Sequence, residues 1–105
     1  MEPFELIVRP VRLSEFQKRI EAIYLERDRK RGIPGTFVWF VEEVGELARA
    51  VARQDDKARR EELADCLAWL STLASLHGID LEEAVSKYAD GCPRCRMTPC
   101  GCSHK

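Results

Sequence analysis

The spacing of apolar residues along the chain predicts a helical protein. Apolar side chains recur every three or four positions in four stretches, and Gly, Pro and Asp residues interrupt the pattern between them. Thr36 is a candidate N-cap for the second stretch, and His77-Gly78 is a typical helix end for the third. The predicted fold class is therefore all-α, a four-helix bundle with helices at about 14–29, 36–53, 56–76 and 80–88.

The second and third of these helices carry more apolar surface than a bundle of this size can bury. Phe37 to Val41 are five apolar residues in a row, so they cover more than one face of a helix. An extra apolar face on a small helical chain is typical of self-association, most often about a two-fold axis. We expect a homodimer or a homotetramer.

Two pairs of acidic residues lie inside the same two helices. Glu43 and Glu46 are three residues apart, as are Glu62 and Asp65, and residues at this spacing share a helix face. Trp39 lies four positions before Glu43, and Trp69 lies four positions after Asp65. If the helices pack antiparallel, four carboxylates and two indole rings meet on one side of the pair.

Such a cluster needs a counter-charge, because like charges at close range oppose folding. Mg²⁺ takes carboxylate oxygens and substrate phosphates as ligands, so the cluster indicates phosphate chemistry. Glu43 or Glu46 is a candidate to accept a proton from an attacking water, and Trp39 and Trp69 are candidates to stack on a nucleobase. The alternatives are solvated helix faces for the acids and core packing for the tryptophans.

Composition and charge narrow the classes of partner. The chain has 105 residues, 45% hydrophobic and 33% charged, with a formal net charge of −1. These values indicate a globular domain without the positive field that nucleic acid requires. No apolar run reaches the length of a membrane span and no signal pattern begins the chain, so we expect a cytoplasmic protein that binds no membrane. The charged run at 26–31 reads as a solvated helix end; alternatively, Arg29, Lys30 or Arg31 binds phosphate.

The C-terminal segment differs from the rest of the chain in its high cysteine content, which suggests a helical domain at 1–90 and a Cys-rich tail at 91–105. Cys92, Cys95, Cys100 and Cys102 form C-x₂-C and C-x-C pairs within eleven residues. Closely spaced thiols in a reducing compartment favour tetrahedral Zn²⁺ over disulfides, and four Cys ligands make the zinc structural. Redox-active or incidental cysteines are the alternative, and His104 could replace one ligand. Cys66 lies on an apolar helix face and is expected in the core.

The acidic residues also match a family signature. Glu42, Glu43 and Glu46, followed by Glu62 and Asp65, resemble the E-E-x-x-E…E-x-x-D pattern of the MazG-like nucleotide pyrophosphohydrolases. The resemblance implies an all-helical oligomer that uses Mg²⁺ to hydrolyse nucleoside triphosphates, or their deoxy forms, to the monophosphate and pyrophosphate, as in house-cleaning of nucleotide pools. It makes Glu43, Glu46, Glu62 and Asp65 the metal ligands.

The sequence also departs from the family pattern after the predicted fourth helix. Family members often carry a Lys after the fourth helix, then Asn four positions later and then Arg, which help to hold the phosphates. Lys87 matches the first of these and is a candidate substrate contact, but Gly91 stands at the Asn position. Arg94 could compensate.

Two other functions remain open from the sequence. One is a related hydrolase acting on phosphoribosyl-ATP, which uses a similar helical scaffold. The other is a non-enzymatic module that binds nucleic acid or protein through its zinc knuckle, because Arg94, Arg96, His104 and Lys105 form a weak basic patch.

Overall fold

The computed structural model describes residues 8–103 and confirms the all-α prediction over that range. Its elements are α1 (Leu13–Ala52), α2 (Asp56–Leu76), α3 (Leu81–Val85) and a 3₁₀ turn, η1 (Ser86–Tyr88). The described part of the chain thus has three α-helices, so the predicted number of four is wrong. His104, the proposed substitute zinc ligand, lies outside the described residues.

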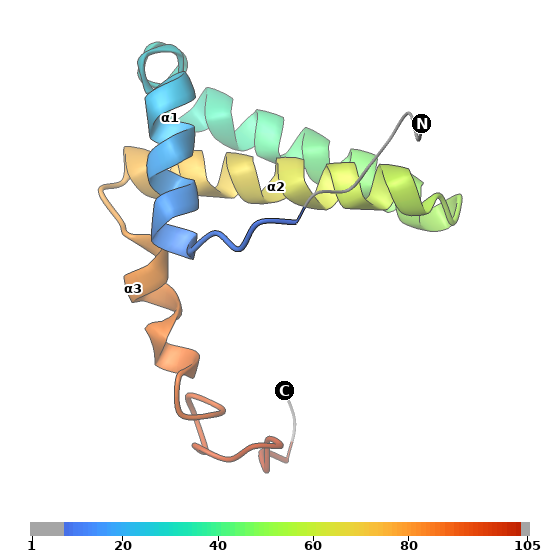
Figure 1. Ribbon diagram of the computed structural model, residues 1–105, viewed down its shortest axis with the longest axis vertical. Helices are drawn as coiled ribbons and strands as arrows, with labels where there is room; N and C mark the ends of the chain where they lie inside the picture. Colours follow the sequence, from blue (N-terminus) through green and yellow to red (C-terminus); the bar gives the residue numbers. More distant parts are fainter. Residues whose placement is uncertain (1–7, 104–105) are drawn as a thin grey trace.

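The miscount comes from the glycine-proline segment, which bends α1 without ending it. Gly32 has φ 82° and ψ 170°, a conformation that only glycine adopts at low cost. Pro34 lies inside the helix and removes one backbone donor. The first part of α1 therefore turns sharply into the second, as Figure 1 shows in blue and teal. Thr36, predicted as an N-cap, lies within α1 and is fully buried.

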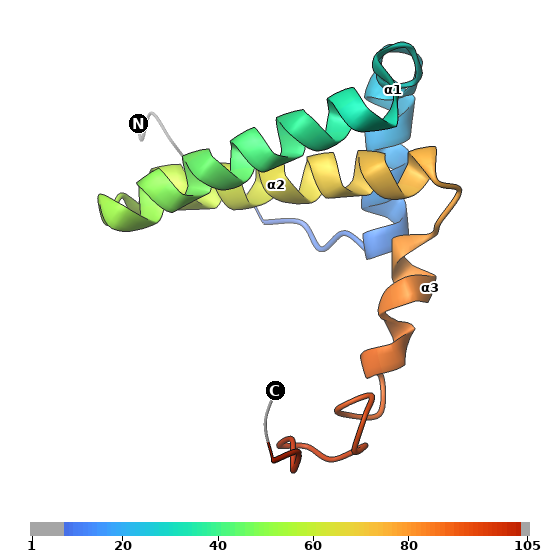
Figure 2. The ribbon, with the colours of Figure 1, turned by 180° about the vertical axis from the view of Figure 1, so that it is seen from behind.

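The second part of α1 runs alongside α2 in the opposite direction, as Figure 2 shows. A short turn joins them, and the Asp55 carboxylate caps α2 by accepting a hydrogen bond from the Ala58 N–H at 3.1 Å. This is the antiparallel pairing on which the predicted carboxylate cluster depends.

The first part of α1 crosses the C-terminal half of α2, and Gln17 holds the crossing together. Its buried amide donates to Ser75 Oγ at 3.1 Å and to the Ile79 carbonyl at 2.8 Å, and its oxygen accepts from the Leu81 N–H at 2.8 Å. One side chain thus joins α1 to α2 and to the start of α3.

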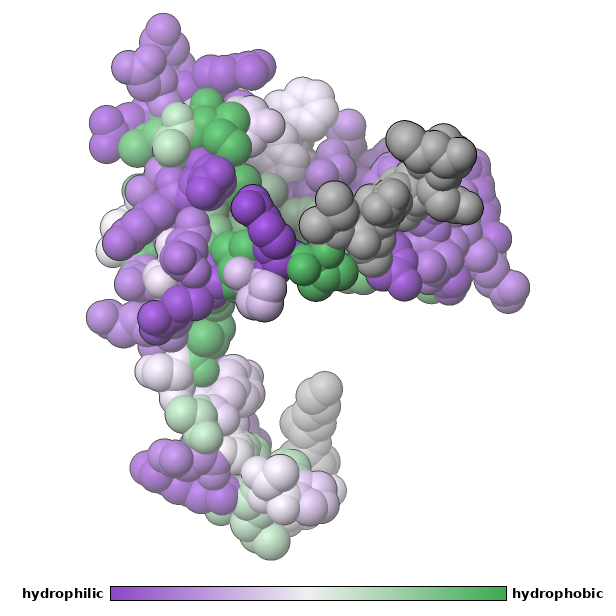
Figure 3. All heavy atoms as spheres, in the orientation of Figure 1, coloured by the Kyte–Doolittle hydropathy of each residue, from purple (hydrophilic) through white to green (hydrophobic). Residues whose placement is uncertain are grey.

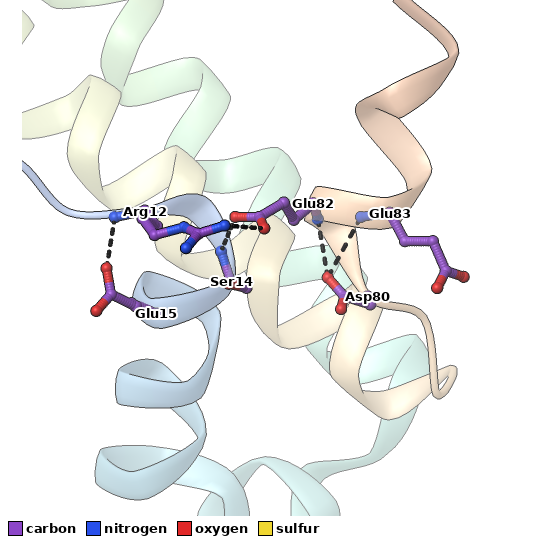
Figure 4. A network of polar contacts seen from close by, with 6 residues as sticks. All are labelled: Arg12, Ser14, Glu15, Asp80, Glu82 and Glu83. Atoms are coloured by element: carbon purple, nitrogen blue, oxygen red, sulfur yellow. Dashed lines mark hydrogen bonds and ion pairs between the residues drawn. The ribbon is translucent and has the colours of Figure 1, made fainter. Parts of the chain in front are cut away.

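A polar network fixes α3 against the start of α1 (Figure 4). Asp80 caps α3, accepting hydrogen bonds from the N–H groups of Glu82 and Glu83. The Glu82 carboxylate accepts from the Ser14 N–H at 3.1 Å and pairs with Arg12 at 3.3 Å. Beyond this anchor, η1 leads away from the helices to the Cys-rich segment (Figure 1).

The described chain buries few apolar side chains. The hydrophobic residues that are buried are Ile20, Ala50 and Ala74, whereas many large ones are exposed. Figure 3 shows such residues, in green, at the surface of the helical part. Among the helices described, none is long and apolar enough to cross a membrane.

Candidate metal centres and nucleotide cavity

Three of the four predicted carboxylates converge between α1 and α2. Oxygen atoms of Glu43, Glu62 and Asp65 all lie within 4.8 Å of one another. Residues 43 on α1 and 62 and 65 on α2 meet because the two helices run antiparallel. An all-oxygen donor set of this size suits a hard divalent cation.

The environment of Glu43 in the cluster favours its protonated form. Its Oε2 atom is buried and has no hydrogen-bond partner within the described residues. Burial, followed by the proximity of Glu62 and then of Asp65 and Glu46, raises the pKa of Glu43 from 4.5 to about 7. A bound cation would give this oxygen a partner and offset the repulsion, so the residues fit a metal ion.

The raised pKa predicts how the metal-free protein responds to pH. Because folded Glu43 holds its proton up to pH about 7 and the unfolded residue releases it near 4.5, the stabilising contribution is full below pH 4.5 and is lost as pH rises through 7. Thermal unfolding in chelator should therefore show falling stability across this window. Glu43→Gln should flatten this part of the curve, and Mg²⁺ should restore stability above pH 7. An unchanged pH curve in Glu43→Gln would contradict this account.

Glu46 lies outside the group of three. Its carboxylate pairs with Arg49 in the next helical turn. It is near enough to contribute to the raised pKa of Glu43, and the three-residue spacing keeps both on one helix face. Cys66, expected in the core, is half-buried beside the cluster, where burial and then Glu43 raise the pKa of its thiol.

A cavity of about 450 Å³ opens beside the carboxylates. Trp39 and Trp69, the two predicted base-stacking residues, both lie on the wall of this cavity. Their ring centroids are 6.3 Å apart and their planes are tilted by 16°. Asp65 belongs to both the cluster and the cavity, so a ligand in the cavity reaches the candidate metal centre. The full lining comprises Ile20, Tyr24, Arg27, Asp28, Arg31, Trp39, Asp65, Ala68, Trp69 and Thr72.

The structure shows which of the three candidate phosphate-binding residues in the run at 26–31 lies at the cavity. Arg31 lines the cavity, with its guanidinium carbon 4.9 Å from the centroid of the Trp69 ring, whereas Arg29 and Lys30 are exposed. The interpretation of the whole run as a solvated helix end is wrong for Asp28 and Arg31. Asp28 is only 3% exposed and hydrogen-bonds to Arg31 and Thr72.

Sequence reasoning missed Asp28 and Thr72 as cavity residues. A signal exists in the spacing, since Ile20, Tyr24, Asp28 and Arg31 follow one another at helical intervals. The apolar face of the first helix therefore continues into the charged run. Thr72 lies seven positions after Asp65, which is close to two helical turns.

Lys87 and Arg94 lie apart from this cavity. Lys87 is on η1, with its ammonium nitrogen 5.2 Å from the centroid of the Tyr88 ring. Arg94 lines a hollow beside the cysteines. Within one described chain, neither side chain belongs to the carboxylate cavity.

The four tail cysteines form a second cluster. Their sulfur atoms all lie within 4.8 Å of one another, with Cys92 to Cys102 at 3.8 Å and Cys95 to Cys100 at 3.9 Å. A tetrahedron with Zn–S bonds of about 2.3 Å has edges of about 3.8 Å. The spacing therefore fits a tetrahedral metal site.

Backbone N–H groups favour the thiolate form of two of these cysteines. The Gly101 N–H, 3.3 Å from Cys95 Sγ, and then the Met97 N–H lower the pKa of Cys95 to about 6. The N–H groups of Cys95 and Arg94 lower the pKa of Cys92. Interaction with the other sulfurs, first that of Cys100, raises the pKa of Cys102 to about 11, so a bound cation is needed to make Cys102 a thiolate at neutral pH.

The turn into this cluster explains the departure at Gly91. Gly91 has φ 108°, and a Cβ atom there would lie 2.7 Å from Thr98 Oγ1 and 3.1 Å from the carbonyls of Arg96 and Met97. An Asn side chain does not fit this position without moving the turn. The position at which the resemblance led us to expect Asn is used here to start the Cys-rich segment.

Comparison with known families identifies one domain family, over the second part of α1 and the residues that follow it. The model of the MazG nucleotide pyrophosphohydrolase domain matches residues 35–95, which is more than half of the 105 residues. The match includes the three clustered acids, both tryptophans and two of the four tail cysteines. A search of curated proteins finds no match. The chain belongs to the MazG nucleotide pyrophosphohydrolase family.

Proposed function

We propose that this protein is a Mg²⁺-dependent pyrophosphohydrolase that converts a nucleoside triphosphate, or its deoxy form, to the monophosphate and pyrophosphate, and that it serves in house-cleaning of nucleotide pools. The observation that carries the proposal is the position of Glu43, Glu62 and Asp65 at the edge of a cavity walled by two tryptophans. Family membership supports the reaction class.

In this proposal Glu43, Glu62 and Asp65 hold Mg²⁺, and Glu46 completes the acidic site. When bound, Mg²⁺ supplies charge neutralisation at the phosphate oxygens and acidifies water. The two indole rings hold the base, and Arg31, fixed beside Trp69, adds a positive charge to the cavity.

The reaction consumes one water per triphosphate. The water oxygen bonds to a phosphorus of the α–β bridge, the bond from that phosphorus to the bridging oxygen breaks, and monophosphate and pyrophosphate separate. A carboxylate takes one proton from the water. Glu46 suits this role better than Glu43, because it lies outside the group of three oxygen ligands and its side chain is 40% exposed, whereas the Oε2 atom of Glu43 is buried.

The Cys-rich tail, residues 91–105, is proposed as a structural Zn²⁺ unit attached to a helical domain at 1–90. Four sulfur ligands leave no open coordination position for chemistry. Lys87, just before this unit, is proposed as a phosphate contact supplied to the cavity of another copy, since it lies apart from the cavity of its own chain.

Self-association is proposed because both helices of the pair expose an apolar stripe. On α1 the stripe is Phe37, Val41, Val44 and Val51, each 43% to 53% exposed. On α2 it is Leu63, Leu67 and Leu70, each 39% to 57% exposed. Both follow helical spacing, so a second copy of the pair can cover them as in a four-helix bundle.

A charge placed in the α1 stripe should weaken this association. Val41→Arg buries an unpaired guanidinium if a second copy covers the stripe, so the dissociation constant should rise at least about tenfold. Sedimentation equilibrium measures the change. Val8→Arg is the control, because Val8 is 75% exposed and lies outside the helices. An oligomer unaffected by Val41→Arg would exclude this stripe as the interface.

The test of the proposed reaction is a panel of ribo- and deoxyribonucleoside triphosphates incubated with the protein and Mg²⁺, with the products separated by anion exchange. Monophosphate and pyrophosphate in equal amounts are expected. Release of orthophosphate, or no turnover by folded protein with bound Mg²⁺, would overturn the proposal. Phosphoribosyl-ATP belongs in the panel as the alternative substrate.

A further inference from the structure

The cavity extends well beyond the carboxylates. Asp65 and Thr72 both line it, and they are seven positions apart, a rise of about 10 Å along α2. The phosphates of a nucleotide belong at the Asp65 end, beside the candidate metal centre. A sugar and base extending from them reach toward Thr72, where the first part of α1 closes the cavity.

A buried acceptor lies at this far end. Asp28 is 3% exposed, and its two carboxylate oxygens accept hydrogen bonds from Arg31 Nη1 at 2.9 Å and from Thr72 Oγ1 at 3.1 Å. A carboxylate accepts about four hydrogen bonds, so two donors leave it with acceptor capacity. Because Asp28 lines the cavity, a ligand there can supply a further donor.

A fixed donor lies beside this acceptor. Arg31 donates through Nη1 to Asp28 and to Thr36 Oγ1, the latter at 3.2 Å, and its guanidinium lies over the Trp69 ring. Since both of these hydrogen bonds use Nη1, the groups on Nη2 and Nε keep N–H donors for a ligand. Thr36 is fully buried, so two buried acceptors, the Asp28 carboxylate and the Thr36 hydroxyl, fix the position of the Arg31 guanidinium.

This inference rests on the proposed function. We propose that Asp28 and Arg31 hydrogen-bond to the base of the nucleotide and select a base with an amino group beside a ring acceptor, as in cytosine or adenine. The amino group donates to Asp28, and the neighbouring ring nitrogen accepts from Arg31. Uracil, thymine and hypoxanthine place a carbonyl oxygen where these bases carry the amino group. That oxygen would face the carboxylate, so two acceptors would meet in a buried site.

The test compares matched nucleotides that differ only at this edge of the base, where the amino group becomes a carbonyl and the neighbouring ring nitrogen gains a hydrogen. CMP is compared with UMP, and AMP with IMP, by quenching of tryptophan fluorescence in the full-length protein. Both tryptophans of the chain line the cavity, so the signal reports on this site without requiring turnover. Each amino-bearing nucleotide should bind at least about tenfold more tightly than its partner, because a hydrogen bond to a charged group is lost in the other.

Asp28→Asn should reduce both ratios to about one or invert them, because an amide can turn its N–H toward a carbonyl. Asp56→Asn is the matched control: Asp56 pairs with Arg60 at 2.9 Å on the exposed start of α2 and should leave both ratios unchanged. If Asp28→Asn weakened all four nucleotides equally, Asp28 would only position Arg31, and the proposal would fail. If this variant does not fold, the two affinity ratios of the unmodified protein are decisive by themselves, and ratios near one overturn the proposal.

The outcomes separate this inference from the proposed reaction. Turnover of triphosphates without a preference for amino-bearing bases would leave the reaction standing and overturn base selection. A preference for amino-bearing bases in monophosphate binding, without turnover of triphosphates, would support base selection and overturn the proposed reaction.

Discussion

Replacing Asp65 with Asn should lower kcat at least about 100-fold and weaken Mg²⁺ binding while the protein stays folded. Asp65 is exposed and faces two other carboxylates, so the substitution removes a negative charge from a repulsive cluster. The substitution also replaces one carboxylate oxygen of the candidate metal centre with an amide nitrogen, which does not bind Mg²⁺, while a side chain of the same size still lines the cavity. Steady-state kinetics, Mg²⁺ titration calorimetry and circular dichroism measure the three effects.

The controls for this prediction come from the same helices. Asp56→Asn removes a charge from the exposed start of α2, away from the cavity, and should leave kcat unchanged within about twofold. Glu46→Gln should lose turnover to a similar degree as Asp65→Asn but retain more Mg²⁺ affinity, since Glu46 lies outside the group of three. An Asp65→Asn variant with more than a tenth of normal turnover would show that this cluster is not the active site.

Cys95→Ser should abolish stable zinc binding and unfold the segment that follows η1. Structural zinc contributes roughly 10 kcal/mol or more to the folding of small sites. Cys95 is the thiol whose pKa falls to about 6, so it supplies a thiolate at neutral pH. Zinc affinity should fall by more than the roughly 100-fold that losing an outer-shell partner costs. Metal analysis after dialysis against a chelator, with proteolysis of the tail, measures both effects.

Cys66→Ser is the control for zinc content, because Cys66 lies on α2 outside the tail cluster. Turnover should fall much less in Cys95→Ser than in Asp65→Asn if zinc only holds the tail together. Retention of one zinc per chain by Cys95→Ser under chelation would contradict the four-sulfur site. Loss of turnover equal to that of Asp65→Asn would instead place the tail in the active site.

Local spacing was sufficient to predict most of the side chains that come together at the candidate site. Glu43, Glu62, Asp65 and the two tryptophans could be identified because a helix brings residues three or four apart onto one face, and because a short turn makes neighbouring helices antiparallel. The Cys-rich segment was predictable for a similar reason, since its sulfur ligands lie within eleven residues of one another. The identity of the metals and the oligomeric state stay predictions.

The helix count could not be obtained in this way. Gly32, Pro34 and Gly35 are all signals that end helices, and sequence patterns do not distinguish a break from a kink. The difference depends on how the first part of α1 packs across α2, through contacts such as that of Gln17 with Ser75, 58 residues away in the chain.

The sequence alone therefore determined the helical class, the carboxylate and tryptophan faces and the cysteine cluster, because each depends on residues that are neighbours along one helix or one turn. Only the tertiary structure showed that Asp28 and Arg31 line the cavity, that Arg29 and Lys30 do not, and that Lys87 lies elsewhere in its own chain. The positions of Asp28 and Arg31 depend on the kink at Gly32, which places the charged end of the first part of α1 against Thr72 and Trp69 of α2. A charged residue is stable in such a place only when partners from distant segments satisfy it, and helical periodicity carries no record of those partners.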